Sequence, residues 1–330
     1  MAKPYRALVV DKPGDDVTVN LVDRTTDDLP DGDVTIRVAY SSVNYKDGLA
    51  TLAKGGVVRN YPHVPGIDLA GSVTESTDAR FKTGDEVLIT GFDLGVAHDG
   101  GFAELARVPA DWVVKKPDGL SLRDCMLFGT AGFTAGLAVQ ALEAHGVSPD
   151  NGPILVTGAT GGVGSVAVSM LANLGFDVAA STGKDSEHDY LKSLGASEIL
   201  SRDEVSAESR PLDKGRFAGA IDQVGGSTLP WLMARMSYRG AIACTGLTGG
   251  VAYSSTVLPL LLRGVSVLGI DSVLCPMEER PPLWKRLAGD LRPKHLDDEI
   301  AVETDLDGLK DVLAKILKGG VRGRTVVKLD

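Results

Sequence analysis

A glycine-rich turn between an apolar segment and an amphipathic one constrains the fold of this chain more than any other feature. The turn Gly158-Ala-Thr-Gly-Gly-Val-Gly164 separates residues 154–157, a predicted buried strand, from residues 163–174, whose apolar side chains recur at helical spacing. Glycines let a pyrophosphate approach the backbone, and the turn aims the free N–H groups of the helix at that anion. A purely structural turn is the alternative, but the position between strand and helix favours a dinucleotide site.

From about residue 126 onward, predicted strands alternate with helices. Gly195 ends a helix that Ser186 and Asp189 open with a pattern resembling a capping box. Further strands are expected at residues 177–180, 199–200, 218–222, 241–245 and 265–270. Such alternation is typical of a doubly wound parallel sheet, so residues 126–299 are predicted to be a nucleotide-binding domain.

The first 125 residues have a different pattern. Residues 34–40 alternate polar and apolar side chains with period two, residues 86–89 follow a Gly-Asp turn, and glycines and prolines punctuate the rest. This pattern predicts a β-rich, barrel-like domain. A helix near residues 309–317 and a strand at 325–329 are expected to return to it, so that residues 300–330 complete the first domain.

Composition excludes several classes of function. The 34 Lys and Arg against 44 Asp and Glu give a net charge of −10, which disfavours nucleic acid and anionic membranes as partners. Three scattered cysteines cannot build a four-thiolate zinc site, and they fit a reducing compartment. The apolar run at residues 7–10 is too short for a signal peptide, and the apolar stretch 257–270 is interrupted by Pro259 and Arg263. We expect a cytoplasmic protein with no membrane span.

The end of the second predicted strand selects the cofactor. An NAD site normally carries an acidic residue there to hold the ribose 2′-hydroxyl. Here Ser181, Thr182, Gly183 and Lys184 come first, and no carboxylate appears before Asp185. Hydroxyls and an ammonium suit a 2′-phosphate, which a carboxylate would repel. The sequence therefore predicts NADPH, with a solvated loop lysine as the alternative for Lys184.

A β-rich domain before such a nucleotide domain resembles the medium-chain dehydrogenase/reductase superfamily. The supporting motifs are Asn44-Tyr-Lys-Asp47 and residues 65–71, 84–87, 101–104 and 158–164. The resemblance implies an α/β protein, with a GroES-like β-rich catalytic domain, a Rossmann-like doubly wound parallel sheet domain, and an active site in the cleft between them.

The zinc ligands of that superfamily are missing. Zinc alcohol dehydrogenases place Cys near Asn44-Tyr45 and Gly-His-Glu at Gly66-Ile67-Asp68, and they carry a four-cysteine lobe that this chain lacks. His63 has no thiolate neighbour in the sequence and is expected to be structural. The resemblance is therefore to a zinc-free branch with no metal.

Further segments are similar to the acryloyl-CoA reductase family, whose members are also described as quinone oxidoreductase-like. These segments are residues 41–47, 129–135, 190–196, 219–222, 269–273 and 323–325. The resemblance implies NADPH contacts from Tyr45, Thr160, Gly161, Gly162, Val163, Thr182, Gly183, Lys184, Arg202, Leu247, Leu261, Ser272 and Lys318.

The same resemblance implies reduction of a C=C bond conjugated to a thioester, most simply of acryloyl-CoA to propanoyl-CoA. Hydride adds to the β-carbon, and the enolate is protonated at the α-carbon. Tyr45 and Asn44 are the candidates for proton donation or positioning, with water as the alternative donor. Arg324 is a candidate for the CoA phosphates, with a surface ion pair as its alternative.

Two other functions stay open. An NADPH:quinone oxidoreductase would need aromatic surface for stacking, yet aromatic residues make up only 5% of the chain. A non-catalytic NADPH-binding protein is the other alternative. Residues 265–273 form an apolar strand at the predicted sheet edge, so we expect a homodimer that pairs two such edges.

Overall fold

The computed structural model describes residues 2–329, which form two compact units. The first unit comprises residues up to 130 together with 273–288 and 301–329, and the second comprises 131–272 and 289–300. The first boundary thus lies five residues after the expected position, since 130 − 125 = 5. Residues 273–288, expected in the nucleotide-binding domain, belong instead to the first unit.

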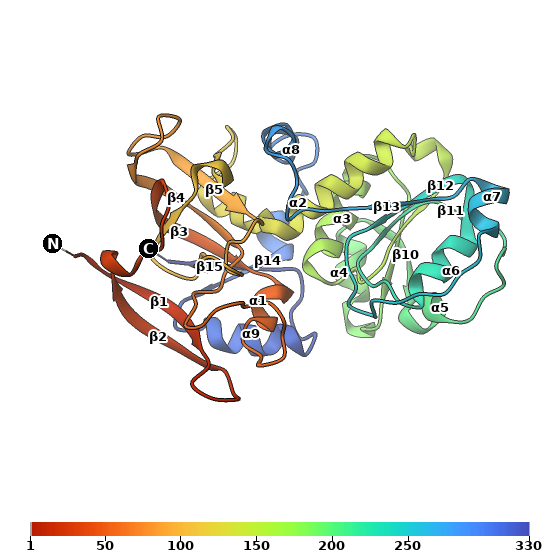
Figure 1. The fold of residues 1–330 in the computed structure, drawn as a ribbon. Coiled ribbons are helices and arrows are strands. Elements are labelled where there is room, and N and C mark those ends of the chain that lie inside the picture. The colour runs from red at the N-terminus through yellow and green to blue at the C-terminus, as the bar shows by residue number, and fades with distance from the viewer. Residues whose placement is uncertain (1, 330) are drawn as a thin grey trace. The chain divides into compact units, whose positions relative to one another are not determined.

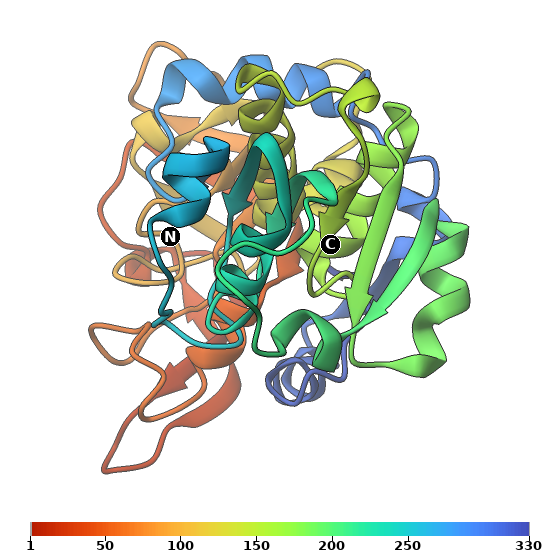
Figure 2. The same cartoon turned by 90° about the vertical axis from the view of Figure 1, so that its right-hand side faces the viewer.

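The first unit is built mainly from antiparallel strands, and only the pair β14 and β15 is parallel among its described strands. Its strands are β1 (Pro4–Asp11), β2 (Thr18–Thr25), β3 (Val34–Val43), β4 (Asp68–Ser76), β5 (Glu86–Thr90), β6 (Leu105–Val108), β7 (Val114–Lys115), β14 (Ala301–Asp305) and β15 (Arg324–Lys328). β1 and β2 form a hairpin, drawn in red in Figures 1 and 2. The remaining strands form a sheet in the order β14-β15-β3-β4-β5-β7, with β6 also paired to β3.

The C-terminal return is the part of the first unit that the sequence located best. Helix α9 (Leu309–Leu317) has the predicted bounds, and it buries Leu309 and Leu313, one helical turn apart, in the core of the unit. β15 pairs with β3, so the last strand joins the sheet that also contains β4 and β5. Short helix α1 (Tyr45–Leu49) packs on α9, and Gly48 makes this close approach possible because a Cβ there would lie 2.9 Å from Ile316.

The second unit contains a six-stranded parallel sheet in the order β10-β9-β8-β11-β12-β13. Its strands are β8 (Ile154–Val156), β9 (Val178–Thr182), β10 (Ala196–Ser201), β11 (Phe217–Asp222), β12 (Met236–Cys244) and β13 (Ser266–Gly269). In chain order this is 3-2-1-4-5-6, the arrangement of the doubly wound dinucleotide-binding fold. The predicted fold class is therefore confirmed, and the order reverses between β8 and β11.

Helices cover both faces of this sheet. They are α3 (Gly162–Asn173), α4 (His188–Ser193), α5 (Arg202–Ser206), α6 (Thr228–Arg235) and α7 (Leu258–Arg263). Figure 1 shows α3 and α4 against one face and α5 and α6 against the other. The predicted capping box is wrong, because Ser186 lies in a 3-10 turn, Asp185–Glu187, that precedes α4 and gives it no side-chain cap. Gly195 follows α4 with the predicted positive φ of 106°.

Helix α2 (Leu122–Ala144) passes from one unit to the other, and α8 (Arg280–Leu287) completes the set of α-helices in residues 2–329. By length and composition alone, α2 is apolar enough to cross a membrane, although the sequence analysis did not single it out. However, 78% of its apolar window is buried inside the structure, and it has a kink at Gly129. Both features are typical of a core helix.

Candidate functional site

The glycine turn has the geometry that a dinucleotide needs. β8 ends at Val156 and α3 begins at Gly162, with Gly158 at a φ of +55° between them. A Cβ on Gly164 would lie 2.5 Å from the carbonyl oxygen of Gly158, so this position accepts no side chain. The first N–H groups of α3 have no partners within the helix, and the turn presents them at the carboxyl edge of the sheet.

The guanidinium of Arg202 lies just beyond the end of β9. A Cβ on Gly183 would lie 2.7 Å from the guanidinium carbon of Arg202, so that guanidinium rests against the backbone next to Lys184. The hydroxyl of Ser201 accepts a hydrogen bond from the backbone N–H of Glu204 at 3.1 Å and caps α5, which places Arg202 at the first helical position. The structure thus brings Arg202 to the loop that carries Thr182, Gly183 and Lys184, all of them predicted to hold the cofactor.

The other predicted cofactor contacts are more scattered. Thr160 is buried within the glycine turn and Ser181 is buried in β9, while Ser272 accepts a hydrogen bond from Thr134 at 2.8 Å. Leu247 and Leu261 are exposed, and Lys318 lies at the end of α9 in the first unit. The roles of these last three residues stay predictions.

A second constellation lies in the first unit, around Asp68. The Oδ2 atom of this buried carboxylate accepts hydrogen bonds from the hydroxyl of Ser42 at 2.6 Å and from the amide of Asn44 at 2.7 Å. Thr130 donates its backbone N–H to the same oxygen at 2.9 Å and its hydroxyl to Oδ1 at 2.5 Å. Asp68 therefore organises the segment that leads into α1, where Tyr45 is the first residue.

The kink in α2 creates this arrangement. Gly129 has a φ of +51°, and a Cβ there would lie 2.5 Å from Oδ2 of Asp68 and 2.6 Å from Nη2 of Arg324. Only glycine fits, because any side chain would collide with the buried ions. The kink turns the N–H of Thr130 toward Asp68. This contact explains why glycine and threonine stand at the start of the segment 129–135, which the sequence alone did not show.

Arg324 is the cation of this cluster. Its guanidinium lies 3.8 Å from Asp68 and donates to the carbonyl of Val43, the hydroxyl of Ser42 and, at 3.3 Å, Oδ1 of Asn44. Burial lowers its pKa, while Asp68 and Asp47 act in the opposite direction. Only 2% of Arg324 is exposed, so the structure does not support the predicted contact with CoA phosphates. The predicted surface ion pair is wrong too, since its partner carboxylate is buried.

Asn44 is also committed to this cluster. Its Nδ2 donates to Asp68 and, at 3.4 Å, to the carbonyl of Ser42, while its Oδ1 accepts from Arg324. An amide with both ends occupied is a poor donor to a substrate enolate. Positioning of the neighbouring Tyr45, which is 45% exposed, is the role that the geometry favours for Asn44.

Asp47 completes the cluster as a second buried carboxyl. It accepts hydrogen bonds from the backbone N–H groups of Asn44 at 2.7 Å and Ile67 at 3.0 Å. Burial, and then the nearby Asp68, raise the pKa of Asp47 to about 7. Asp47 thus joins the loop before α1 to the segment before β4.

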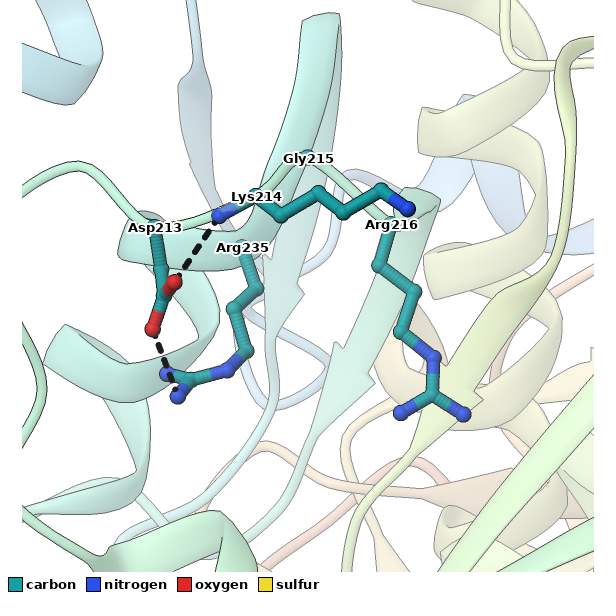
Figure 3. Close-up of a pocket in the computed structure, with 5 residues that line it drawn as sticks. All are labelled: Asp213, Lys214, Gly215, Arg216 and Arg235. Atoms are coloured by element: carbon teal, nitrogen blue, oxygen red, sulfur yellow. Dashed lines mark hydrogen bonds and ion pairs between the residues drawn. The ribbon is translucent and has the colours of Figure 1, made fainter.

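The pocket drawn in Figure 3 is separate from the glycine turn and is lined mainly by charged side chains. It measures about 390 Å³ and is lined by four residues that precede β11 and by the last residue of α6: Asp213, Lys214, Gly215, Arg216 and Arg235. It therefore lies where β11 begins, at the opposite edge from the glycine turn. Arg235 pairs with Asp213 at 3.0 Å and Arg216 pairs with Glu198, so its arginines already have counter-ions.

Comparison with known proteins agrees with this picture. Residues 30–118 match the family model of the alcohol dehydrogenase GroES-like domain, and residues 162–289 match that of the zinc-binding dehydrogenases. The chain is 50% identical to the putative quinone oxidoreductase YhfP of Bacillus subtilis, with both proteins covered in full. The chain belongs to the medium-chain dehydrogenase/reductase superfamily.

Within this superfamily, other similar proteins carry different names. The acrylyl-CoA reductase AcuI of Ruegeria pomeroyi is 50% identical over 99% of each chain. The crystal structure of the YhdH oxidoreductase of Salmonella enterica in complex with NADP superposes with a TM-score of 0.96 at 48% identity, covering 98% of this chain and 100% of that one. The YhfP crystal structure, described with NAD bound, gives a TM-score of 0.97 over 99% and 100% of the two chains.

The superfamily includes zinc enzymes, so the metal-ligand positions matter. Among residues 2–329, no group of three or more His, Cys, Asp or Glu side chains is placed to hold a metal ion. His63 is buried, with its Nδ1 3.5 Å from Asp99, and burial lowers its pKa. Asp68, which was expected at the Glu position of the Gly-His-Glu motif of the zinc enzymes, accepts hydrogen bonds from Asn44, Ser42 and Thr130.

Sequence reasoning missed much of this superfamily member's site. It treated Asp68 only as a replaced metal position, and it gave Ser42 and Thr130 no role. It also passed over Gln223, a side chain beside Gly158. The one signal available was an acidic residue, Asp68, at the start of a mostly buried strand, since a buried carboxylate needs donors and a counter-ion.

Proposed function

We propose that this protein is a cytoplasmic, NADPH-dependent reductase of the C=C bond of a short 2-enoyl-CoA, most simply acryloyl-CoA, which it converts to propanoyl-CoA. The similarity to AcuI over 99% of both chains carries the proposal. Its three cysteines are free, which is typical of a reducing compartment.

The residues present fit NADPH. A Cβ at Gly164 would lie 2.5 Å from the carbonyl oxygen of Gly158, so the turn keeps its backbone open to a pyrophosphate, and we expect Lys184 and Arg202 to hold the 2′-phosphate. The Salmonella structure with NADP supports this choice, whereas the YhfP structure with NAD makes a direct comparison of the two cofactors necessary.

When bound, NADPH supplies the hydride that adds to the β-carbon of the enoyl thioester. The π electrons then move toward the thioester oxygen, and the resulting enolate takes a proton at the α-carbon, which regenerates the thioester carbonyl. Tyr45 is our candidate for the donor, since a neutral phenol gives up a proton more readily than it accepts one. The Asp68 cluster would act by fixing the segment that carries Tyr45.

We further propose that no metal takes part, because the ligand positions of the zinc enzymes carry Asn44-Tyr45 and Ile67-Asp68. Stoichiometric zinc in the purified protein would contradict this. With Arg324 buried, exposed cations of the first unit such as Lys54 and Arg59 are the remaining candidates for the CoA phosphates. Their neutralisation is expected to raise the KM for the CoA substrate more than the KM for NADPH.

A homodimer is the proposed assembly. β13 forms one edge of the parallel sheet, and Val267 on it is exposed, as are Leu260, Leu261 and Leu262 on the neighbouring α7. An apolar edge strand of this kind is an open template for pairing with a second copy.

The second candidate function is reduction of quinones, which the name of YhfP favours. Oxidation of NADPH should be measured with acryloyl-CoA, crotonoyl-CoA, an enone and a small quinone. The proposal expects the highest kcat/KM for a short enoyl-CoA. Preference for the quinone would reject it, and no turnover with any acceptor would favour a non-catalytic NADPH-binding protein.

A further inference from the structure

Gln223, the first residue after β11, has a buried side chain without hydrogen-bond partners. Only 9% of the residue is exposed, and among residues 2–329 neither Oε1 nor Nε2 has a donor or acceptor within reach. Buried amides in folded proteins are nearly always hydrogen-bonded, so an unmatched one calls for a specific reason. A ligand that binds beside it would supply such a reason.

The backbone around Gln223 is held firmly. Its N–H donates to the hydroxyl of Thr157 at 3.2 Å, and its carbonyl accepts from the hydroxyl of Thr248 at 3.1 Å. Asp222, the preceding residue, accepts from the same Thr157 hydroxyl at 2.6 Å and from the N–H of Gly225 at 3.1 Å. These bonds join the ends of β8, β11 and β12, so the backbone does not turn to release the amide.

The amide lies where this fold binds its ligand. A Cβ built on Gly158, the first glycine of the turn, would lie 3.5 Å from Oε1 of Gln223. Gly158 follows β8 and Gln223 follows β11, and the strand order reverses between these two neighbouring strands. In doubly wound sheets, the crevice beyond the carboxyl ends at such a reversal is the ligand site.

The topology also indicates which half of the cofactor faces Gln223. Lys184 and Arg202, which we proposed for the 2′-phosphate of the adenosine half, follow β9 and β10 on one side of the reversal. The half that carries the nicotinamide therefore belongs over β11 to β13. Of its groups, ribose hydroxyls match an amide best, because they both donate to Oε1 and accept from Nε2, whereas a pyrophosphate only accepts.

We propose that Gln223 binds the hydroxyls of the nicotinamide ribose through its side-chain amide. The inference rests on the proposed binding of NADPH. It adds a residue that neither the glycine turn nor the proposed roles of Lys184 and Arg202 imply. Gln223 then contributes to affinity for the whole dinucleotide but not to affinity for its adenosine half.

The test measures binding without turnover. Isothermal titration of wild type, Gln223→Leu and the nearly isosteric Gln223→Met should use NADPH and 2′,5′-ADP, a fragment that lacks the nicotinamide ribose. Both variants should raise the Kd for NADPH about tenfold and leave the Kd for 2′,5′-ADP within about twofold. Gln140→Leu, a matched change on a half-buried residue of α2, should alter neither value.

The outcomes separate this inference from the cofactor assignment. If wild type and a folded Gln223 variant bind NADPH equally well, the inference is wrong while the assignment stands. Equal weakening of NADPH and 2′,5′-ADP also overturns it, since the adenosine half should not sense Gln223. If wild type binds neither ligand, the cofactor assignment fails and this inference fails with it.

Discussion

The side-chain amide of Asn44 donates a hydrogen bond to the buried carboxylate of Asp68 at 2.7 Å, while its carbonyl accepts one from Arg324. A neutral amide thus bridges a buried anion and a buried cation. The two hydrogen bonds fix the orientation of Asn44, the residue that precedes Tyr45. They also make the stability of the first unit depend on two charges, those of Asp68 and Arg324, that are buried away from solvent.

Replacement of Asp68 by asparagine should destabilise the protein strongly. The change removes the carboxylate and leaves Arg324 buried with only Asp47 nearby, a situation that typically costs about 3–5 kcal/mol. Urea unfolding measures the effect. Asp307→Asn is the control, because its ion pair with Arg6 is exposed and should contribute less than about 1 kcal/mol. Equal effects of the two variants would contradict the role of Asp68.

Asp47 should make stability fall as the pH rises from about 4 to about 7. Its pKa is raised from 3.8 to about 7 in the folded protein, so in this range the folded state holds a proton that the unfolded state has released. The free energy of unfolding should therefore decrease by up to about 4 kcal/mol across the window and level off above it. Unfolding midpoints between pH 4.5 and 8 report the slope.

Asp47→Asn, which is neutral at every pH, should lack this component of the slope. Asp307→Asn should retain the slope of wild type. If the free energies of unfolding of Asp47→Asn and of wild type change in parallel between pH 4.5 and 7, the Asp47 carboxyl is not protonated in the folded state.

Lys184→Ala and Arg202→Ala should each weaken NADPH binding. A lost charge-assisted bond to a phosphate corresponds to about a tenfold rise in Kd, and NADH, which lacks the 2′-phosphate, should be affected less than twofold. Fluorescence titration with both nucleotides measures this. Lys192→Ala, on the exposed side of α4, should change neither value. Wild-type protein that binds NADH as tightly as NADPH would refute the predicted cofactor choice.

Tyr45→Phe should lower kcat about 100-fold if the phenol is the proton donor, since general acid catalysis typically contributes at least this factor. The Kd for NADPH should change less than threefold. Tyr238→Phe, an exposed tyrosine of β12, provides the matched control. An unchanged kcat would assign the proton to water and leave Tyr45 a packing role.

Val267→Lys should convert a dimer to monomers. The substitution places a charge at each copy of an edge strand that would pair with its twin, and edge lysines are a common device against such pairing. Sedimentation velocity at micromolar concentration gives the result. Val302→Lys, on the exposed edge strand β14 of the other sheet, should leave the assembly of wild type unchanged. A wild-type monomer would refute the proposed dimer.

Local patterns in the sequence determined much of this protein. The turn at residues 158–164 and the helix of α9 were predicted within a residue or two, because glycine placement and helical periodicity depend on neighbours along the chain. The parallel sheet followed from the alternation of such segments. Ser186 shows the limit, since its short-range pattern is satisfied by a 3-10 turn instead of a cap.

Only the tertiary structure decided how the charged groups are used. Arg324 was predicted to face a ligand, yet it meets Ser42 and Asn44, about 280 residues earlier in the chain. Gln223 was unremarkable in the sequence, and its importance comes from burial beside Gly158. A charged or amide side chain is well hydrated at any surface position, so the residue type alone does not predict where in the fold the side chain lies. Burial decides its role, because away from water each such group must find a partner, and that partner can come from any part of the chain.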